Sequence, residues 1–100
     1  MTDRERLPNR RAAETFDLEV AGLCYTCTVG RFDDGRVAEI FLTNHKAGSH
    51  AGIMASDAAV LASIALQYGA PLETLCKAMM RDPRGNASGP LGVALDRIPR

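Results

Sequence analysis

Residues 14–44, ETFDLEVAGLCYTCTVGRFDDGRVAEIFLTN, decide the fold of this chain because apolar and polar side chains alternate along most of the stretch. Phe16, Leu18 and Val20 alternate with acidic residues, which is typical of a strand with one buried and one exposed face. A second alternating run, rich in β-forming residues, follows Gly22, where we expect a tight turn. The residues of this run that we expect to face the core are Leu23, Tyr25, Cys27 and Val29.

A third strand is predicted from about Arg36 to Thr43. The Asp34-Gly35 pair before it supplies the positive φ angles of a tight hairpin, so this strand returns antiparallel to the second one. We expect Ile40 and Leu42 to face the core. The residues expected to face away from it are Val37 and Phe41. The three strands together then form an antiparallel β-meander.

A long helix is predicted after the strands, because residues 53–66 are mostly small and are apolar on nearly all sides. Ser56 or Asp57 would cap its start, unless the helix begins one turn earlier. Gly69 ends it, in the position where a left-handed residue usually terminates a helix. Such a helix needs burial on two flanks, so we expect it to pack on the sheet and against another helix or a second subunit.

Two shorter helices are predicted downstream. Pro71 starts the first, which ends near Arg81, and the run LGVALDRI after Pro90 forms a short terminal helix. The predicted fold class is therefore α+β, a three-stranded antiparallel β-meander followed by two packed helices and a short C-terminal helix. Residues 14–100 form a single domain, and residues 1–13 form a basic arm that we expect to be disordered or peripheral.

The composition restricts the classes of function. A chain of 100 residues has the size of one domain, and its 12 basic and 12 acidic side chains cancel. Nucleic acid is not favoured as a partner, because the net field is absent and aromatic side chains that could stack on bases are few. The apolar runs are too short to span a bilayer and the first residues are charged, so we expect a cytoplasmic protein with reduced cysteines and no membrane contact.

Three segments of the chain resemble a known family. They are LPNRRAAETFDLEVAGLCYTCTVGRFDDGRVAEIFL from Leu7, DAAVLASIALQYGAPLETL from Asp57, and GPLGVALDRI, which ends at Ile98. Together they resemble the TSCPD domain, which is similar to the C-terminal region of adenosylcobalamin-dependent ribonucleoside-diphosphate reductases and also occurs as small free-standing proteins. The resemblance implies a link to deoxyribonucleotide synthesis and DNA replication. It carries no catalytic residue across, because the radical chemistry of those reductases takes place in a separate barrel.

The turn between the third strand and the long helix is the segment that we expect to face a ligand. Backbone N–H groups at a helix start attract anions, and a lysine with two histidines would reinforce a bound phosphate or carboxylate. The residues predicted for anion or nucleotide binding are His45, Lys46, Gly48, Ser49, His50 and Arg84. The spacing of a phosphate-binding P-loop is absent, so the alternative is a solvated connection that binds nothing.

Cys24 and Cys27 form a C-x-x-C pattern, which elsewhere marks a redox pair or half of a zinc site. Three residues along a strand span about 10 Å and reverse the side-chain direction, so we expect the two sulfurs on opposite faces of the sheet. Cys76 is expected to be an apolar filler on a helix face. We predict no catalytic residues, no metal site and no cofactor.

We expect a non-catalytic accessory or regulatory module related to ribonucleotide reduction, with a ribonucleotide reductase or a nucleotide as its partner. No acid–base pair or activated nucleophile is visible, so we do not expect activity from the chain alone. The alternative is a stand-alone protein-binding or scaffolding homodimer without a ligand. A homodimer is expected in either case, because the long helix and the two-sided strands leave apolar surface to be covered.

Overall fold

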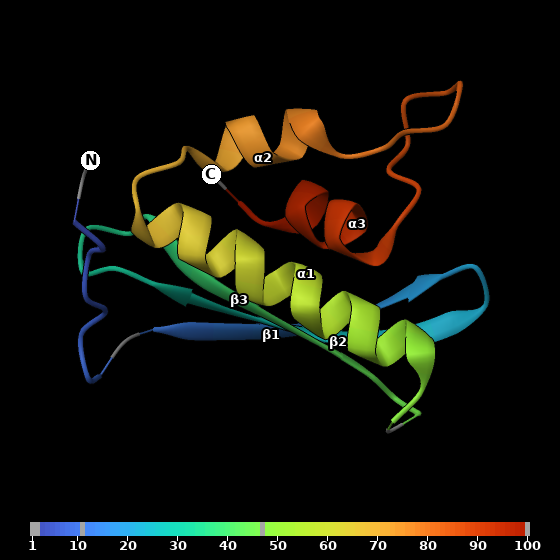
Figure 1. The fold of residues 1–100 in the computed structure, drawn as a ribbon, viewed down its shortest axis with the longest axis horizontal. Helices are drawn as coiled ribbons and strands as arrows, with labels where there is room; N and C mark the ends of the chain where they lie inside the picture. The colour runs from blue at the N-terminus through green and yellow to red at the C-terminus, as the bar shows by residue number, and fades with distance from the viewer. Residues whose placement is uncertain (1–2, 11, 47, 100) are drawn as a thin grey trace.

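The computed structural model describes residues 3–10, 12–46 and 48–99, and its elements follow the predicted order (Figure 1). The strands are β1 (Ala13–Val20), β2 (Leu23–Arg31) and β3 (Val37–Asn44). The helices are α1 (His50–Gln67), α2 (Leu72–Ala78) and α3 (Pro90–Arg97). The strands form one antiparallel sheet in the order β1-β2-β3, which with the helices after it confirms the predicted α+β fold.

The core lies between the sheet and the three helices. Figure 1 shows α1 lying along the sheet, with α3 and then α2 beside it. Ile40 and Leu42 of β3 and Leu95 of α3 are the largest fully buried apolar side chains. α3 is also held to β1, because the Arg97 guanidinium lies 4.6 Å from the centre of the Phe16 ring. The core therefore joins the meander to the C-terminal helix, the last element of the chain.

Each of the two hairpin turns contains a glycine with a positive φ angle. Val20 pairs with Leu23 across the first turn, whose two central residues, Ala21 and Gly22, have φ angles of 53° and 78°. Positive φ at both positions matches the twist of the flanking strands. Gly35, with a φ of 92°, completes the turn between β2 and β3, whereas Asp34 does not have the positive φ angle that was also expected of it. These turns fix the register of the sheet.

A β-bulge near the start of β3 corrects one expectation. Gly30 pairs with Glu39 whereas Arg31 pairs with Val37, so Ala38 is an extra residue in β3. The extra residue turns Val37 toward the core, where it is 7% exposed. The prediction that Val37 faces outward is therefore wrong. Beyond the bulge the predicted alternation is confirmed, with Ile40 and Leu42 inside and Phe41 outside.

The start of α1 also differs from the expectation. Ser49 is its N-cap, with extended backbone angles, and its hydroxyl accepts a hydrogen bond from the Gly52 N–H at 3.1 Å. The helix thus begins at His50, ahead of the caps predicted at Ser56 or Asp57, which are both wrong. Its end agrees with the prediction, because the glycine after the C-cap residue has a φ of 102°.

The inner flank of α1 covers the free edge of β3 with polar side chains. Ser63 Oγ accepts from the Ile40 N–H at 2.8 Å and lies 3.0 Å from the Ile40 carbonyl oxygen. The Gln67 amide donates to the Ala38 carbonyl at 3.0 Å. Both side chains are buried, and the backbone groups that they bond would otherwise form an unpaired strand edge. α1 therefore replaces a fourth strand.

The basic arm contacts the C-terminal end of α1. The Glu5 N–H donates to the Gln67 carbonyl at 2.7 Å, and the Arg4 side chain bonds the Gln67 amide oxygen at 2.6 Å. The Glu5 carboxylate accepts from Arg36 at 2.9 Å, so the arm also contacts the β2–β3 turn. Arg11, one of its four arginines, lies outside the described residues.

α2 is shorter than expected, because it ends at Ala78 and not near Arg81. Pro71 is its N-cap and not its first helical residue, whereas Pro90 occupies the first turn of α3.

Among the described residues, no helix has both the length and the apolar character needed to cross a bilayer.

Candidate functional site

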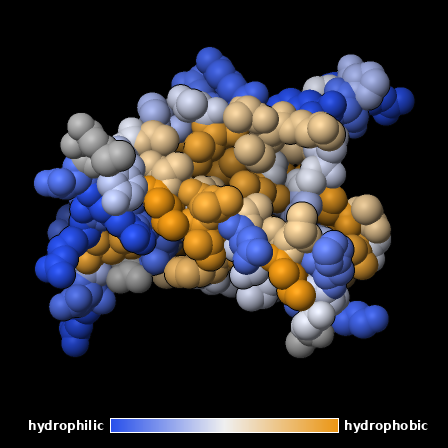
Figure 2. All heavy atoms as spheres, viewed as in Figure 1, coloured by the Kyte–Doolittle hydropathy of each residue, from blue (hydrophilic) through white to orange (hydrophobic). Residues whose placement is uncertain are grey.

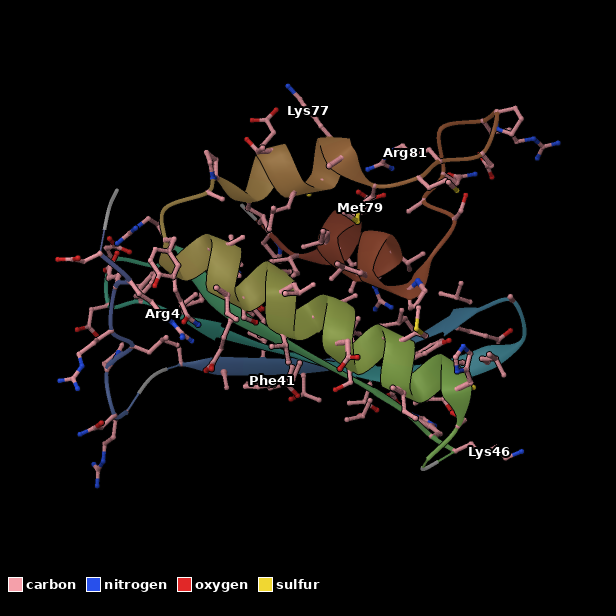
Figure 3. The ribbon with its side chains drawn as sticks, viewed as in Figure 1. Arg4, Phe41, Lys46, Lys77, Met79 and Arg81 are labelled. Carbon is pink, nitrogen blue, oxygen red and sulfur yellow. The ribbon has the colours of Figure 1, made fainter. Side chains whose placement is uncertain are left out.

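The turn from β3 to α1 brings five of the six predicted anion-binding residues into one segment. They are His45, Lys46, Gly48, Ser49 and His50. Gly48 has a φ of 73°, a conformation that favours glycine, and it leads directly into the N-cap Ser49. Figure 3 shows the Lys46 side chain extending away from the body of the protein. The segment thus places an exposed cation, Lys46, beside the N-terminus of an 18-residue helix with no acidic residue in its first turn.

His45 lies against the sheet. Its Nε2 atom is 2.9 Å from the Thr26 hydroxyl oxygen and 3.8 Å from an Asp17 carboxylate oxygen. The same carboxylate accepts a hydrogen bond from Thr26 at 2.8 Å. Protonated His45 would therefore pair with Asp17, which reduces its attraction for an external anion. Lys46 and His50 remain the cationic candidates of the turn.

A hollow of about 410 Å³ adjoins the turn. Asn44 forms part of its wall and organises the turn, because its side-chain oxygen accepts from the Lys46 N–H at 2.8 Å. Asp57, two turns into α1, lines the same hollow and carries a negative charge there. An anion in this hollow would meet both Lys46 and Asp57, so the local charge is mixed.

The sixth predicted residue, Arg84, lies in the loop between α2 and α3. Figure 1 shows that this loop and the β3–α1 turn occupy different parts of the molecule. The Arg84 N–H donates to the Asp82 carboxylate at 2.9 Å, which shapes its own loop. Nearby, Asp96 binds Arg81 at 2.8 Å and raises the pKa of that guanidinium. The structure therefore does not bring Arg84 next to the β3–α1 turn. Anion binding at the turn stays a prediction.

Cys24 and Cys27 lie on opposite faces of the sheet, as predicted. Cys24 is exposed, whereas Cys27 is buried among core residues. Burial raises the pKa of the Cys27 thiol to about 11, an effect that the positive charge of Arg97 reduces in part. A thiol of this kind is protonated at neutral pH and is a poor nucleophile and metal ligand. Within the described ranges, no group of three metal-binding side chains is found.

An apolar groove between α1 and the α2–α3 segment is the feature that the sequence did not locate. Its larger part has a volume of about 500 Å³ and is lined by Tyr25, Met54 and Met79, among others. A second part of about 310 Å³ continues along α1 past Leu61 and shares Met79 with the first. Figure 2 shows apolar side chains gathered over this face. The sequence contains one indication of this groove: the long helix is apolar on nearly all sides, so it was expected to be covered on a second flank as well as by the sheet.

Comparison with known proteins places the chain in a family. Residues 5–95 match the model of the TSCPD domain. A segment of a vitamin B12-dependent ribonucleotide reductase from Agrobacterium fabrum is 42% identical over 76 residues, which is 76% of this chain and 6% of that protein. The reductases of the same name from Rhodopirellula baltica and Streptomyces coelicolor are 38% and 37% identical over 85% and 71% of this chain.

The chain spans only 6–8% of the length of these relatives. No solved structure matches it. The match to the family model extends from the arm into α3, so it includes all three strands, α1, α2 and most of α3. The chain therefore belongs to the TSCPD domain family.

Proposed function

We propose that this chain is a non-catalytic accessory module of ribonucleotide reduction, acting in the cytoplasm in the supply of deoxyribonucleotides for DNA replication. One observation carries the proposal: 76 of its residues align at 42% identity with a short segment of a vitamin B12-dependent ribonucleotide reductase. That segment is 6% of the reductase. A part of this size supports a role in contact or regulation more readily than a role in the chemical step.

The chemistry of the side chains supports a non-catalytic role. Burial keeps the Cys27 thiol protonated, and Cys24 on the opposite face has no access to it. Arg81 is bound to Asp96, and His45 to Thr26. These polar groups stabilise the fold. By contrast, the apolar groove beside α1 offers a surface suited to a protein partner.

The test uses the Agrobacterium fabrum reductase in two forms, complete and truncated to remove the segment that matches this chain. We expect the chain to bind the truncated reductase, measured by biolayer interferometry, and to change its rate of nucleotide reduction. The excised segment should compete for the same position, because the two sequences are 42% identical. Failure to bind either form, with no change in turnover, would refute the accessory role.

Nucleotide sensing at the β3–α1 turn is a second candidate. The observation that favours it is the exposed Lys46 beside the N-terminus of α1, whose first turn contains no acidic residue. Thermal-shift measurements against ribonucleotides and deoxyribonucleotides test it. Stabilisation by a nucleotide should be lost in Lys46→Ala and His50→Ala and kept in Lys77→Ala, which removes an exposed lysine of α2. A chain that no nucleotide stabilises is not a sensor.

The competing function is that of a stand-alone, protein-binding homodimer without a ligand. The apolar groove favours it, because a surface of this kind is covered in most soluble proteins. It is distinguished from the accessory role by the reductase-binding test. A dimer that binds neither the complete nor the truncated reductase would support the scaffolding function.

A further inference from the structure

We propose that two copies of this chain pair through α1 in an antiparallel dimer with two-fold symmetry. In this dimer the exposed row Met54, Leu61 and Tyr68 of one copy lies along the small row Ala51, Ala58 and Ala65 of the other. The proposal identifies the surface and the geometry of the homodimer considered above. Its test measures mass and orientation, so its failure is distinguishable from failure to bind a reductase.

The spacing of the exposed residues along α1 is the first observation. Met54, Leu61 and Tyr68 recur every seven residues and are 59%, 68% and 44% exposed. The alanines at 51, 58 and 65 precede them by three residues each, which completes a heptad pattern with apolar residues at its first and fourth positions. This seam runs from Ala51 to Tyr68, the C-cap residue, over about two and a half heptads on the side of α1 that the sheet does not cover. Such a pattern is typical of a helix that pairs with another helix.

The alternation of small and large residues selects the orientation. In an antiparallel pair the first position of one heptad meets the fourth position of the partner helix. Ala58 then opposes the partner's Leu61, while Ala51 opposes the partner's Tyr68. Every layer thus joins one alanine with one large side chain, which allows close approach without a void. A parallel pair would stack alanine on alanine and leucine on leucine in alternate layers.

The groove supplies room for the partner helix. Its two parts, of about 500 and 310 Å³, share Ala58, Met79 and Leu91 and follow α1 along its length. The large side chains of the second copy would enter between α1 and the α2–α3 segment. Figure 2 shows that this face is predominantly apolar. The groove is therefore shaped for an apolar ridge of the kind that α1 itself presents.

Charge does not oppose this contact. Asp57 is the one acidic residue of α1, and the helix contains no lysine or arginine. Asp57 lines the hollow on the β3 side of the helix, away from the groove. The contact surface of α1 is therefore uncharged, and bringing two copies together along it desolvates no ion pair.

The surface area of the chain fits an uncovered interface. Its accessible surface is 6459 Å², whereas a monomeric protein of 10.7 kDa exposes about 5,500 Å² by the usual scaling. The excess of roughly 950 Å² is close to the ~800 Å² that each partner contributes to a standard interface. The surface of the chain is therefore large enough to supply one symmetric contact of standard size.

The first experiment measures the mass of the full chain by size-exclusion chromatography with light scattering at about 50 µM. We expect twice the chain mass of 10.7 kDa. Leu61→Asp, at the centre of the seam, should yield a monomer, and circular dichroism should confirm its fold. Phe41→Asp is the matched control, because Phe41 is 48% exposed on the outer sheet face and should leave the dimer intact. A monomeric wild type, or a Leu61→Asp variant that stays dimeric, overturns the proposal.

The second experiment tests the orientation by oxidative cross-linking in a Cys24→Ser background, which removes the exposed native thiol. In the antiparallel pair, Leu61→Cys lies near the two-fold axis and should cross-link readily. Met54→Cys should not, because its two copies are offset by 11 residues, or roughly 16 Å at 1.5 Å per residue. Equal cross-linking at both positions would indicate a parallel pair and refute the antiparallel geometry.

Discussion

Replacing Ser63 by alanine should destabilise the protein, because it removes the hydrogen bond by which α1 holds the edge of β3. The Ser63 hydroxyl accepts from the Ile40 N–H at 2.8 Å, and its own proton can go to the Ile40 carbonyl at 3.0 Å or to the Ala59 carbonyl at 2.8 Å. Ser63 is 8% exposed and Ile40 is fully buried, so water has little access to the Ile40 N–H once it has lost its acceptor.

The magnitude follows from two opposing effects. Leaving a buried N–H without an acceptor costs about 1–3 kcal/mol. Alanine offsets about 0.5 kcal/mol of this, because it is the better helix former. A net loss of about 1.5 kcal/mol corresponds to a fall in Tm of roughly 6–12 °C for a domain of this size.

Ser56→Ala is the matched control. Ser56 lies on the same helix but is exposed, so its replacement brings the same gain in helix propensity without removing a buried hydrogen bond. The difference in unfolding free energy between the two variants therefore isolates the contact with β3. Both are compared by urea unfolding at one protein concentration, because self-association would make stability concentration-dependent. Equal stability of Ser63→Ala and Ser56→Ala would refute this account of the sheet edge.

Three further predictions concern the ends of α1 and the buried thiol. Ser49→Ala should lower the unfolding free energy by about 0.5–2 kcal/mol in urea titrations, because it removes the N-cap acceptor of the Gly52 N–H. Gly69→Ala should lower it by about 1 kcal/mol or more in the same assay, since a φ of 102° strains any residue with a Cβ, and an unchanged value would contradict this. The thiol of Cys27 has its pKa raised from 9.0 to about 11, so the unfolded chain loses this proton first and stability should fall between these pH values. The loss should total roughly 2–3 kcal/mol and be absent from Cys27→Ala, as measured by unfolding at pH 8 and pH 11.

The strands could be predicted because their signal is local. Alternation with a period of two, together with Gly22 and the Asp34-Gly35 pair, specifies strands and turns from neighbouring residues alone. The bulge at Ala38 could not be predicted in this way, since it depends on how β3 pairs with β2. Gly30, opposite the bulge, gives an indirect sign, because any side chain there would overlap that of Glu39.

The start of α1 was misplaced because two capping signals compete in the sequence. Ser56 and Asp57 are adjacent cap-forming residues, whereas the true cap, Ser49, precedes a first turn that contains the poor helix former Gly52. The structure explains why glycine stands there. An added Cβ at position 52 would lie 3.0 Å from Ser49 Oγ and 3.1 Å from Asn44 Cβ, so the close approach of the cap restricts the size of this residue.

The candidate site was predicted only as far as it is continuous in sequence. The β3–α1 turn needs no tertiary information, because His45 to His50 are neighbours in the chain. The position of Arg84 depends on how α2 and α3 pack, which no local pattern specifies. The groove is non-local for the same reason, since its walls come from α1 and from Met79 and Leu91 beyond it.

The distribution of polarity around α1 links these observations. Its polar side chains Ser63 and Gln67 point inward to the edge of β3, while Met54 and Leu61 point outward, so the usual arrangement of a surface helix is partly reversed. The inward polar side chains have a structural role, because they form hydrogen bonds with backbone groups of β3 that a fourth strand would otherwise bond. The outward apolar groups have no such use within one chain, because polar residues at those positions would keep the same core. Their apolar surface adds stability when another surface covers it, and in the dimer proposed above that surface is α1 of a second copy, which has the same heptad spacing.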